Sequence, residues 1–210
     1  MVVIVRFKVH AQQIIEAGRW IDQQGWCPAT GGNFSIRLDA SSALVTASGC
    51  HKGHLTDDDF LVVNLDGEPL EGHAGRKPSA ETLLHTRLYA LDTRIGAVLH
   101  THSVASTVLS RLESSDWFEL SGYEMQKSLS GNATHDETIR LAVFDNTQDM
   151  TSLADQLSAR WTDQPLQWGF LVSGHGLYAW GRDMQEARRH LEGLEFLFAC
   201  ALEMRRLGAN

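Results

Sequence analysis

The chain has 210 residues, which is enough to bury a sizeable core, and we expect residues 1–210 to form a single domain. Its formal net charge of −8 argues against a nucleic-acid or anionic-membrane partner. The odd number of cysteines and the lack of a long apolar stretch predict a protein of the reducing cytoplasm, without a signal peptide or membrane span.

The first third of the chain is predicted to hold one long helix followed by short strands. Helical periodicity predicts a helix over residues 9–24. A turn-rich segment then leads into a strand that ends near residue 38, and further strands are predicted at residues 44–47 and 60–65. Thr56, followed by three aspartates, is typical of the capped first turn of a short helix between the last two strands.

A second helix is predicted to begin at Lys77-Pro78-Ser79 and to run to about Leu91. Ser79 is its expected N-cap, which places Glu81 in the first turn. The apolar run from Gly96 to Leu99 follows at once and predicts a buried strand.

The second half of the chain alternates predicted helices and strands. Helices are expected at residues 104–112, 150–161 and 183–207, and strands at residues 118–120, 139–144, 170–173 and 177–180. Asp183 and Glu186 have the spacing of a capping box at the start of the last helix. This order of elements predicts an α/β fold, with three α/β/α layers around a mixed, largely antiparallel central sheet.

His100 and His102 directly follow the apolar strand and are two residues apart. Side chains of a strand alternate between its faces, so both imidazoles point the same way from Cα atoms about 6.5 Å apart. This separation lets two ring nitrogens converge on one cation at about 2.0–2.1 Å each. Two histidines on one polar sheet face are the alternative, and a third ligand is needed to complete a metal site.

His175 is the favoured third ligand, because it lies between two glycines at the junction of two predicted strands, where the backbone permits close approach. A histidine in a surface turn is the alternative interpretation. The competing ligands are His135, His51, His54 and Cys50. Three neutral histidines would leave open coordination positions, which is the pattern of a catalytic zinc site. Such a site needs a proton carrier, for which Glu81 and Glu124 are the candidates, with a surface salt bridge as the alternative for each.

Two glycine-containing loops resemble anion-binding sites, because backbone N–H groups at such strand ends can point at phosphate oxygens. The first is Thr30-Gly31-Gly32-Asn33, and the second is Ser48-Gly49-Cys50-His51-Lys52-Gly53. Ser79 adds a hydroxyl at the predicted start of a helix. Together with a metal, these loops predict a small phosphorylated, sugar-like substrate.

On these residues the chain resembles the class II aldolase and adducin family. The matching motifs occur in the family's order: Thr30-Gly31-Gly32-Asn33-Phe34-Ser35, Ser48-Gly49, Lys77-Pro78-Ser79-Ala80-Glu81, His100-Thr101-His102-Ser103 and Gly174-His175-Gly176. The resemblance implies one zinc ion per subunit, held by His100, His102 and His175. It also implies a homotetramer with sites near the subunit interfaces, and a phosphorylated ketose substrate held at Gly32, Asn33, Ser48, Gly49 and Ser79.

Within the family, the chain is most similar to a branch that dehydrates 5-methylthioribulose 1-phosphate in methionine salvage. The segments that suggest this branch are Trp26–Asn33, His51-Lys52-Gly53, Tyr123–Lys127 and Phe144–Met150. The resemblance implies that Glu124 is the general acid and base of the dehydration. Relatives that cleave or epimerise sugar phosphates use an acid at the position of Glu81, where some dehydratases have cysteine.

Further expectations concern the substrate and the alternatives. An apolar wall for the methylthio group is expected from Phe118, Leu120 or Met125. The nearest alternative function is a sugar-phosphate aldolase or 4-epimerase, which would share the zinc and phosphate site. A non-catalytic interaction domain, as in adducin-like proteins, is the second alternative, but it predicts a degenerate metal site, whereas all three histidines are present.

Overall fold

The computed structural model describes residues 7–70 and 75–208. Its strands are β1 (Asn33–Arg37), β2 (Ser42–Thr46), β3 (Phe60–Asn64), β4 (Ala97–Thr101), β5 (Trp117–Leu120), β6 (Ile139–Phe144), β7 (Gly169–Val172) and β8 (Gly176–Gly181). They form one eight-stranded sheet in the order β3-β2-β1-β4-β8-β7-β6-β5. Neighbouring strands are antiparallel except for the parallel pair of β6 and β7, which confirms the predicted mixed, largely antiparallel sheet.

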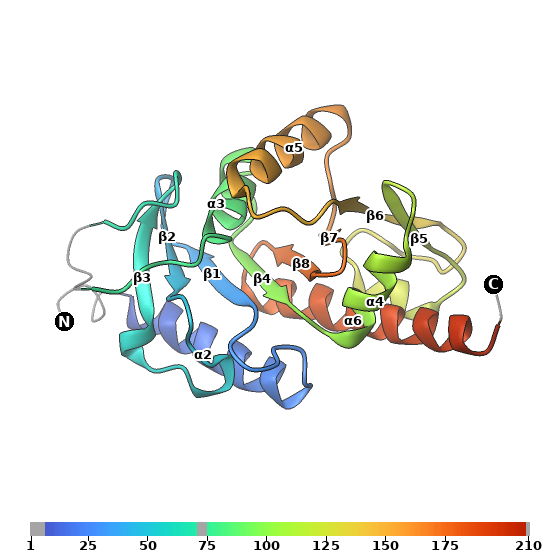
Figure 1. The fold of residues 1–210 in the computed structure, drawn as a ribbon, viewed down its shortest axis with the longest axis horizontal. Coiled ribbons are helices and arrows are strands. Elements are labelled where there is room, and N and C mark those ends of the chain that lie inside the picture. The colour runs from blue at the N-terminus through green and yellow to red at the C-terminus, as the bar shows by residue number, and fades with distance from the viewer. Residues whose placement is uncertain (1–6, 71–74, 209–210) are drawn as a thin grey trace.

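Helices cover both faces of this sheet (Figure 1). The α-helices are α2 (Lys8–Gln23), α3 (Thr82–Leu91), α4 (Val104–Leu112), α5 (Met150–Asp163) and α6 (Met184–Arg206). Short 3-10 helices are η1 (Lys52–His54), η2 (Asp57–Asp59) and η3 (Glu124–Ser128). One apolar core joins the sheet to α2, α4 and α6, and a second joins it to α3 and α5, so the predicted three layers are confirmed.

The central strand β4 contributes to both cores through the alternation of its side chains. Leu99 packs in the core beneath α2, α4 and α6, whereas Val98 packs in the core beneath α3 and α5. His100 shares the face of Val98, and Thr101 shares the face of Leu99. The polar end of β4 therefore presents different chemistry to the two helix layers.

The start of α3 differs from the prediction. The helix begins at Thr82, and Glu81 occupies the N-cap position, two residues after the expected Ser79. The preceding residues are extended because they pair with the end of β2: Pro78 forms a bridge with Ala47, and the Ser48 N–H donates to the Lys77 carbonyl at 2.9 Å. This pairing fixes where the helix can begin and places Glu81 at the edge of the sheet.

The other caps follow the sequence more closely. Asp183 caps α6 by accepting a hydrogen bond from the Glu186 N–H at 2.8 Å. In a capping box the Glu186 carboxylate would accept from the N–H of Asp183. Here it accepts from the N–H of Arg182, one residue earlier. In the described ranges of the chain, no helix combines the length and the hydropathy that crossing a membrane requires.

Candidate metal centre

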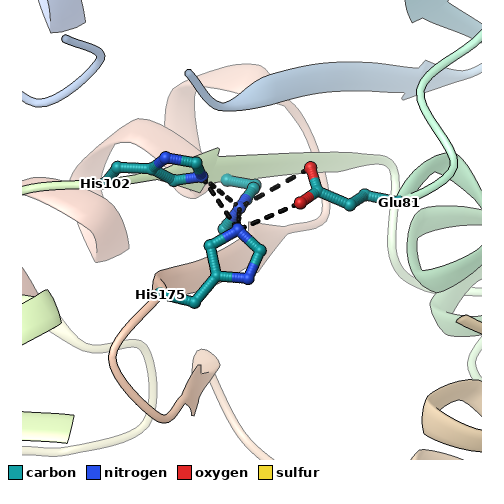
Figure 2. A group of neighbouring side chains, drawn as sticks. Glu81, His102 and His175 are labelled. Atoms are coloured by element: carbon teal, nitrogen blue, oxygen red, sulfur yellow. Dashed lines mark hydrogen bonds and ion pairs between the residues drawn. The ribbon is translucent and has the colours of Figure 1, made fainter. Parts of the chain in front are cut away.

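Four side chains from three parts of the sequence converge at the end of β4 (Figure 2). His100 belongs to β4 and His102 follows it, His175 lies in the turn between β7 and β8, and Glu81 precedes α3. Their ligand atoms all lie within 4.8 Å of one another. The structure thus brings together the three histidines predicted as zinc ligands and one of the two predicted acids.

The spacing of the imidazole nitrogens suits a single cation. The Nε2 atoms of His100 and His102 are 2.8 Å apart, those of His102 and His175 are 3.1 Å apart, and those of His100 and His175 are 3.3 Å apart. Nitrogens bound to one tetrahedral zinc ion at its usual bond length lie about 3.3 Å from one another. Glu81 adds a carboxylate oxygen 3.0 Å from the His175 Nε2 atom.

The tautomer of His100 is set by the neighbouring strand. Its Nδ1 atom lies 2.9 Å from the Leu177 carbonyl, which can only accept, so Nδ1 carries the proton. The Nε2 atom then faces the cluster with a lone pair, as metal binding requires. The ring also stacks on Tyr178, with centroids 3.9 Å apart and planes 13° apart, which fixes its orientation.

Burial keeps the imidazoles of His100 and His102 in the neutral form that binds metal. It lowers the pKa of His100 well below its ordinary value, and burial together with the neighbouring His175 lowers the pKa of His102 to about 4. Burial opposes ionisation of Glu81, but the hydrogen bond with His175 and the other imidazoles outweigh it and lower its pKa to about 2. The imidazole lone pairs and the Glu81 carboxylate surround a common point, and this set of donors fits a divalent cation.

Hydrogen bonds to the main chain hold His102 and His175 in place. The His102 N–H donates to the Trp26 carbonyl at 2.8 Å, which ties the end of β4 to the segment before β1. The turn at His175 is closed by its N–H donating to the Val172 carbonyl at 3.0 Å. The Thr107 hydroxyl of α4 donates to the His175 carbonyl at 2.9 Å. These contacts preorganise the cluster.

The residues predicted to bind phosphate lie at the same end of the sheet. Asn33 donates from Nδ2 to Glu81 at 2.5 Å and to the Ser79 hydroxyl at 3.4 Å. Ser48 is held beside Ser79 through the pairing of the β2 end with Lys77. The second loop glycine, Gly49, has a φ of 77° and no atom within 4 Å of where a Cβ would be. The structure therefore places Asn33 and Ser79 beside Glu81 of the cluster, and Ser48 of the second loop beside the segment that carries Ser79.

Gly32 shows why the first loop needs glycine. Its φ is 75°, a conformation that side chains disfavour, and a Cβ at this position would overlap the His100 carbonyl oxygen. The same Cβ would lie 2.8 Å from the Cys27 sulfur. Only glycine lets the loop lie this close to the strand that carries the metal ligands.

Glu124 is not part of the cluster. It begins η3, its side chain is 71% exposed, and Lys127 lies 2.7 Å from one carboxylate oxygen. The hydrogen bond from Lys127 lowers the pKa of the Glu124 carboxyl. Within the chain itself, no burial raises this pKa, as a general acid at neutral pH would require.

Other candidate residues lie elsewhere. His135 is half exposed beside Glu124, and His51 and His54 pack their rings against each other at 4.6 Å. Among residues 7–70 and 75–208, only the four clustered side chains have the spacing of a metal site. The expectation that Phe118 or Leu120 lines the methylthio pocket is wrong, because both are buried in the core beneath α6, whereas Met125 is exposed.

Two buried ionisable residues near the cluster were given no role by the sequence analysis, although Lys52 lies within one of its motifs. Glu195 of α6 accepts hydrogen bonds from the hydroxyls of Thr101 and Ser103, at 2.9 and 2.5 Å, which flank His102. Lys52 of η1 is buried in the second predicted anion loop, and its Nζ atom donates to a carbonyl of each loop. The sequence does contain a signal that Glu195 is buried. It is an acid on the apolar face of a predicted helix, which also carries Leu191, Leu194 and Phe198.

Comparison with known sequences gives consistent matches. Residues 12–202 match the family described as "Class II Aldolase and Adducin N-terminal domain". The chain is 58% identical over 197 residues to methylthioribulose-1-phosphate dehydratase of Serratia proteamaculans (strain 568), covering 94% of this chain and 96% of that protein. A protein with the same name from Yersinia enterocolitica is 57% identical, covering 94% of this chain and 93% of that protein.

Solved structures with the same fold include two that share about a quarter of the sequence. The crystal structure of YgbL from Escherichia coli has a TM-score of 0.78 and 26% identity, covering 93% of this chain and 89% of that one. L-fuculose-1-phosphate aldolase from Thermus thermophilus has a TM-score of 0.74 and 25% identity, covering 99% of this chain and all of that one.

Proposed function

The chain belongs to the class II aldolase and adducin family, and we propose that it dehydrates 5-methylthioribulose 1-phosphate. The product is 2,3-diketo-5-methylthiopentyl 1-phosphate, and the pathway is methionine salvage. One observation carries the proposal: proteins named for this reaction are 57–58% identical over 94% of the chain. The intact His100, His102 and His175 cluster supports an enzyme over a non-catalytic domain.

We assign the metal as one Zn²⁺ ion per subunit, with His100, His102 and His175 as its ligands. A zinc ion bound to three histidines would act as a Lewis acid that polarises the substrate carbonyl and makes the neighbouring C–H more acidic. Glu81 holds no proton at neutral pH, because its pKa is about 2. This favours a role as a carboxylate associated with the cation over a role as the general acid.

The reaction also needs a group that moves protons. A proton leaves C3, the C4 hydroxyl leaves as water after it gains a proton, and the resulting enol becomes the diketone. We assign the proton at the C4 oxygen to Glu124. Since the Glu124 carboxylate is exposed in a single chain, this role requires that a neighbouring subunit or the substrate covers it and raises its pKa.

We assign the phosphate to the two loops and Ser79. One loop contributes Gly32 and Asn33 and the other contributes Ser48 and Gly49. Because the Ser48 N–H donates to the Lys77 carbonyl, Ser48 would contact the phosphate through its hydroxyl, as would Ser79. Asn33 links these groups to Glu81, so a phosphate held there fixes the distance between the ester end of the substrate and the metal. This arrangement suits a short ketose phosphate.

We further propose a homotetramer that works in the cytoplasm. Large apolar side chains are exposed on the adjacent helices α4 and α6 and at the end of α6: Val104, Leu112, Phe196, Met204 and Leu207. Exposed groups of this kind commonly mark a surface between subunits. The three cysteines of the chain are free, which suits a reducing compartment.

An assay of the purified, zinc-loaded protein on a substrate panel tests this function. The panel contains 5-methylthioribulose 1-phosphate and the phosphates of fuculose, rhamnulose and ribulose. We expect turnover of the methylthio compound alone. Cleavage or epimerisation of one of the other sugars, with the methylthio compound left intact, would favour the aldolase or 4-epimerase alternative, which shares this fold.

A further inference from the structure

Lys52 is a buried positive charge that the proposed mechanism does not use. The residue is 1% exposed, and its side chain is among the largest fully buried ones of the described structure. Burial lowers the pKa of the ammonium group. Lysine is almost never fully buried without a partner or a function, because the charge loses its hydration. The position of Lys52 therefore needs an explanation.

The hydrogen bonds of Lys52 join the two predicted anion loops. Its Nζ atom donates to the Thr30 carbonyl at 2.9 Å and to the Cys50 carbonyl at 2.6 Å. Thr30 lies two residues before Gly32, and Cys50 directly follows Gly49. An ammonium group has three donors, so these two bonds leave one N–H for another acceptor. Lys52 thus connects the loops on the side opposite to solvent.

Helix α2 fixes the main chain from which this side chain extends. The Lys52 carbonyl lies so close to Gly18 of α2 that a Cβ on Gly18 would overlap it. The turn of η1 is further held by the Gly53 N–H, which donates to the His51 ring. Helix α2 therefore fixes the main chain of Lys52, while the two loop carbonyls fix its ammonium group.

The charge of Lys52 also reaches the metal centre. It contributes to the lowered pKa of His102, and the Glu81 carboxylate acts in turn on Lys52. Because the ammonium is buried and bonded to carbonyls of both loops, its field acts on the space between them with little screening. A phosphate dianion between the loops would gain from this charge.

We propose that Lys52 is a positioning residue for a phosphate monoester: it clamps the two loops together and supplies a fixed positive charge beneath the bound phosphate. This inference rests on the proposed function only in assigning the loops to phosphate. It adds a residue that controls phosphate affinity and does not touch the metal.

Calorimetric titration of inorganic phosphate into the zinc-loaded protein tests the proposal. Lys52→Met keeps an unbranched apolar side chain that is one atom shorter, but it removes the charge and both hydrogen bonds. We expect phosphate to bind at least about tenfold more weakly, with zinc content unchanged. Lys8→Met is the matched control, because it removes an exposed charge at the start of α2 and should leave phosphate binding intact. Equal phosphate affinity in wild type and Lys52→Met would overturn the proposal.

A second variant keeps the proposal testable if Lys52→Met does not fold. Lys52→Gln retains an NH₂ donor for the loop carbonyls but carries no charge, so we expect weaker phosphate binding with a wild-type melting temperature. Unchanged phosphate affinity in this variant would also contradict the proposal. With 5-methylthioribulose 1-phosphate, both variants should raise KM far more than they lower kcat. A wild-type protein that binds phosphate but does not dehydrate this substrate would refute the proposed function and leave the role of Lys52 standing.

Discussion

Successive residues at the end of β4 point to opposite faces of the sheet and have different roles there. His100 turns toward the layer of α3, where Glu81 lies, while Thr101 turns toward α6 and donates to Glu195. The alternation of a strand therefore separates metal binding from the support of the ligand strand. Glu195 holds the hydroxyls on both sides of His102, so the ligand is fixed from behind as well as by its own backbone.

Replacing one ligand tests the metal assignment. We expect His102→Ala to lose bound zinc together with activity, because two histidines and a carboxylate leave the ion with a weaker and less selective site. Elemental analysis of the purified variant measures this. His135→Ala is the control, because His135 lies outside the cluster. This variant should keep its zinc. Stoichiometric zinc in His102→Ala would remove that residue from the ligand set.

A second residue-scale prediction concerns the acid. Glu124→Gln should lower the rate of dehydration by at least about a hundredfold, which is the usual contribution of a general acid. Zinc content and melting temperature should not change, because the side chain is exposed. Glu119→Gln is a suitable control, since Glu119 is also exposed and pairs with an arginine on the neighbouring strand. Turnover within a few-fold of wild type in Glu124→Gln would exclude it as the acid.

At the scale of elements, helix α6 carries a buried acid that should make stability depend on pH. Burial raises the pKa of Glu195 from its ordinary value of 4.5 to about 7. The folded state then binds more protons than the unfolded state between these values, so the free energy of unfolding falls as pH rises through this window. The full effect is about 3 kcal/mol.

Urea denaturation of the metal-free protein measures this effect. Between pH 4.5 and 7, the wild-type protein should lose more stability than Glu195→Gln, because glutamine has no proton to release. The difference between the two slopes isolates Glu195 from other titrating groups. Parallel slopes would show that the Glu195 carboxyl keeps an ordinary pKa.

Local patterns predicted most elements but not every boundary. The helix α4 and the strand β6 have the bounds expected from periodicity, because their apolar residues and caps are close in sequence. The N-cap of α3 was predicted two residues early, since the pairing of Pro78 with Ala47 joins residues that are far apart in the chain. That pairing places Glu81, so its contact with His175 could not be read from the sequence.

At the scale of the whole molecule, the site depends on strand order, which periodicity does not provide. His175 reaches His100 because β4 pairs with β8, so that residues 75 positions apart become neighbours. The glycines around His175 suggested the ligand, but His135 remained a competitor until the sheet order placed it elsewhere. Motifs therefore predicted the type of site, whereas long-range pairing determined which residues meet.

Assembly of the subunits determines whether Glu124 can reach the histidine cluster of a neighbouring subunit. If Glu124 of one subunit serves the histidine cluster of another, Glu124→Gln and His102→Ala should each be inactive alone but active when their subunits are mixed. A mixed oligomer contains some sites with an intact acid and an intact cluster. Co-expression with two affinity tags isolates such oligomers for assay. Mixed oligomers without activity would confine Glu124 to its own chain or remove it from the reaction.

The dehydration itself is tested most directly by the mass of the product. The measurement is a mass spectrum, with fragment analysis, of what the zinc-loaded protein forms from 5-methylthioribulose 1-phosphate in deuterium oxide. We expect a product that has lost one water molecule and carries solvent deuterium at C4, because the enol takes up a solvent proton there. Two shorter fragments, or no species lighter than the substrate by one water molecule, would contradict dehydration.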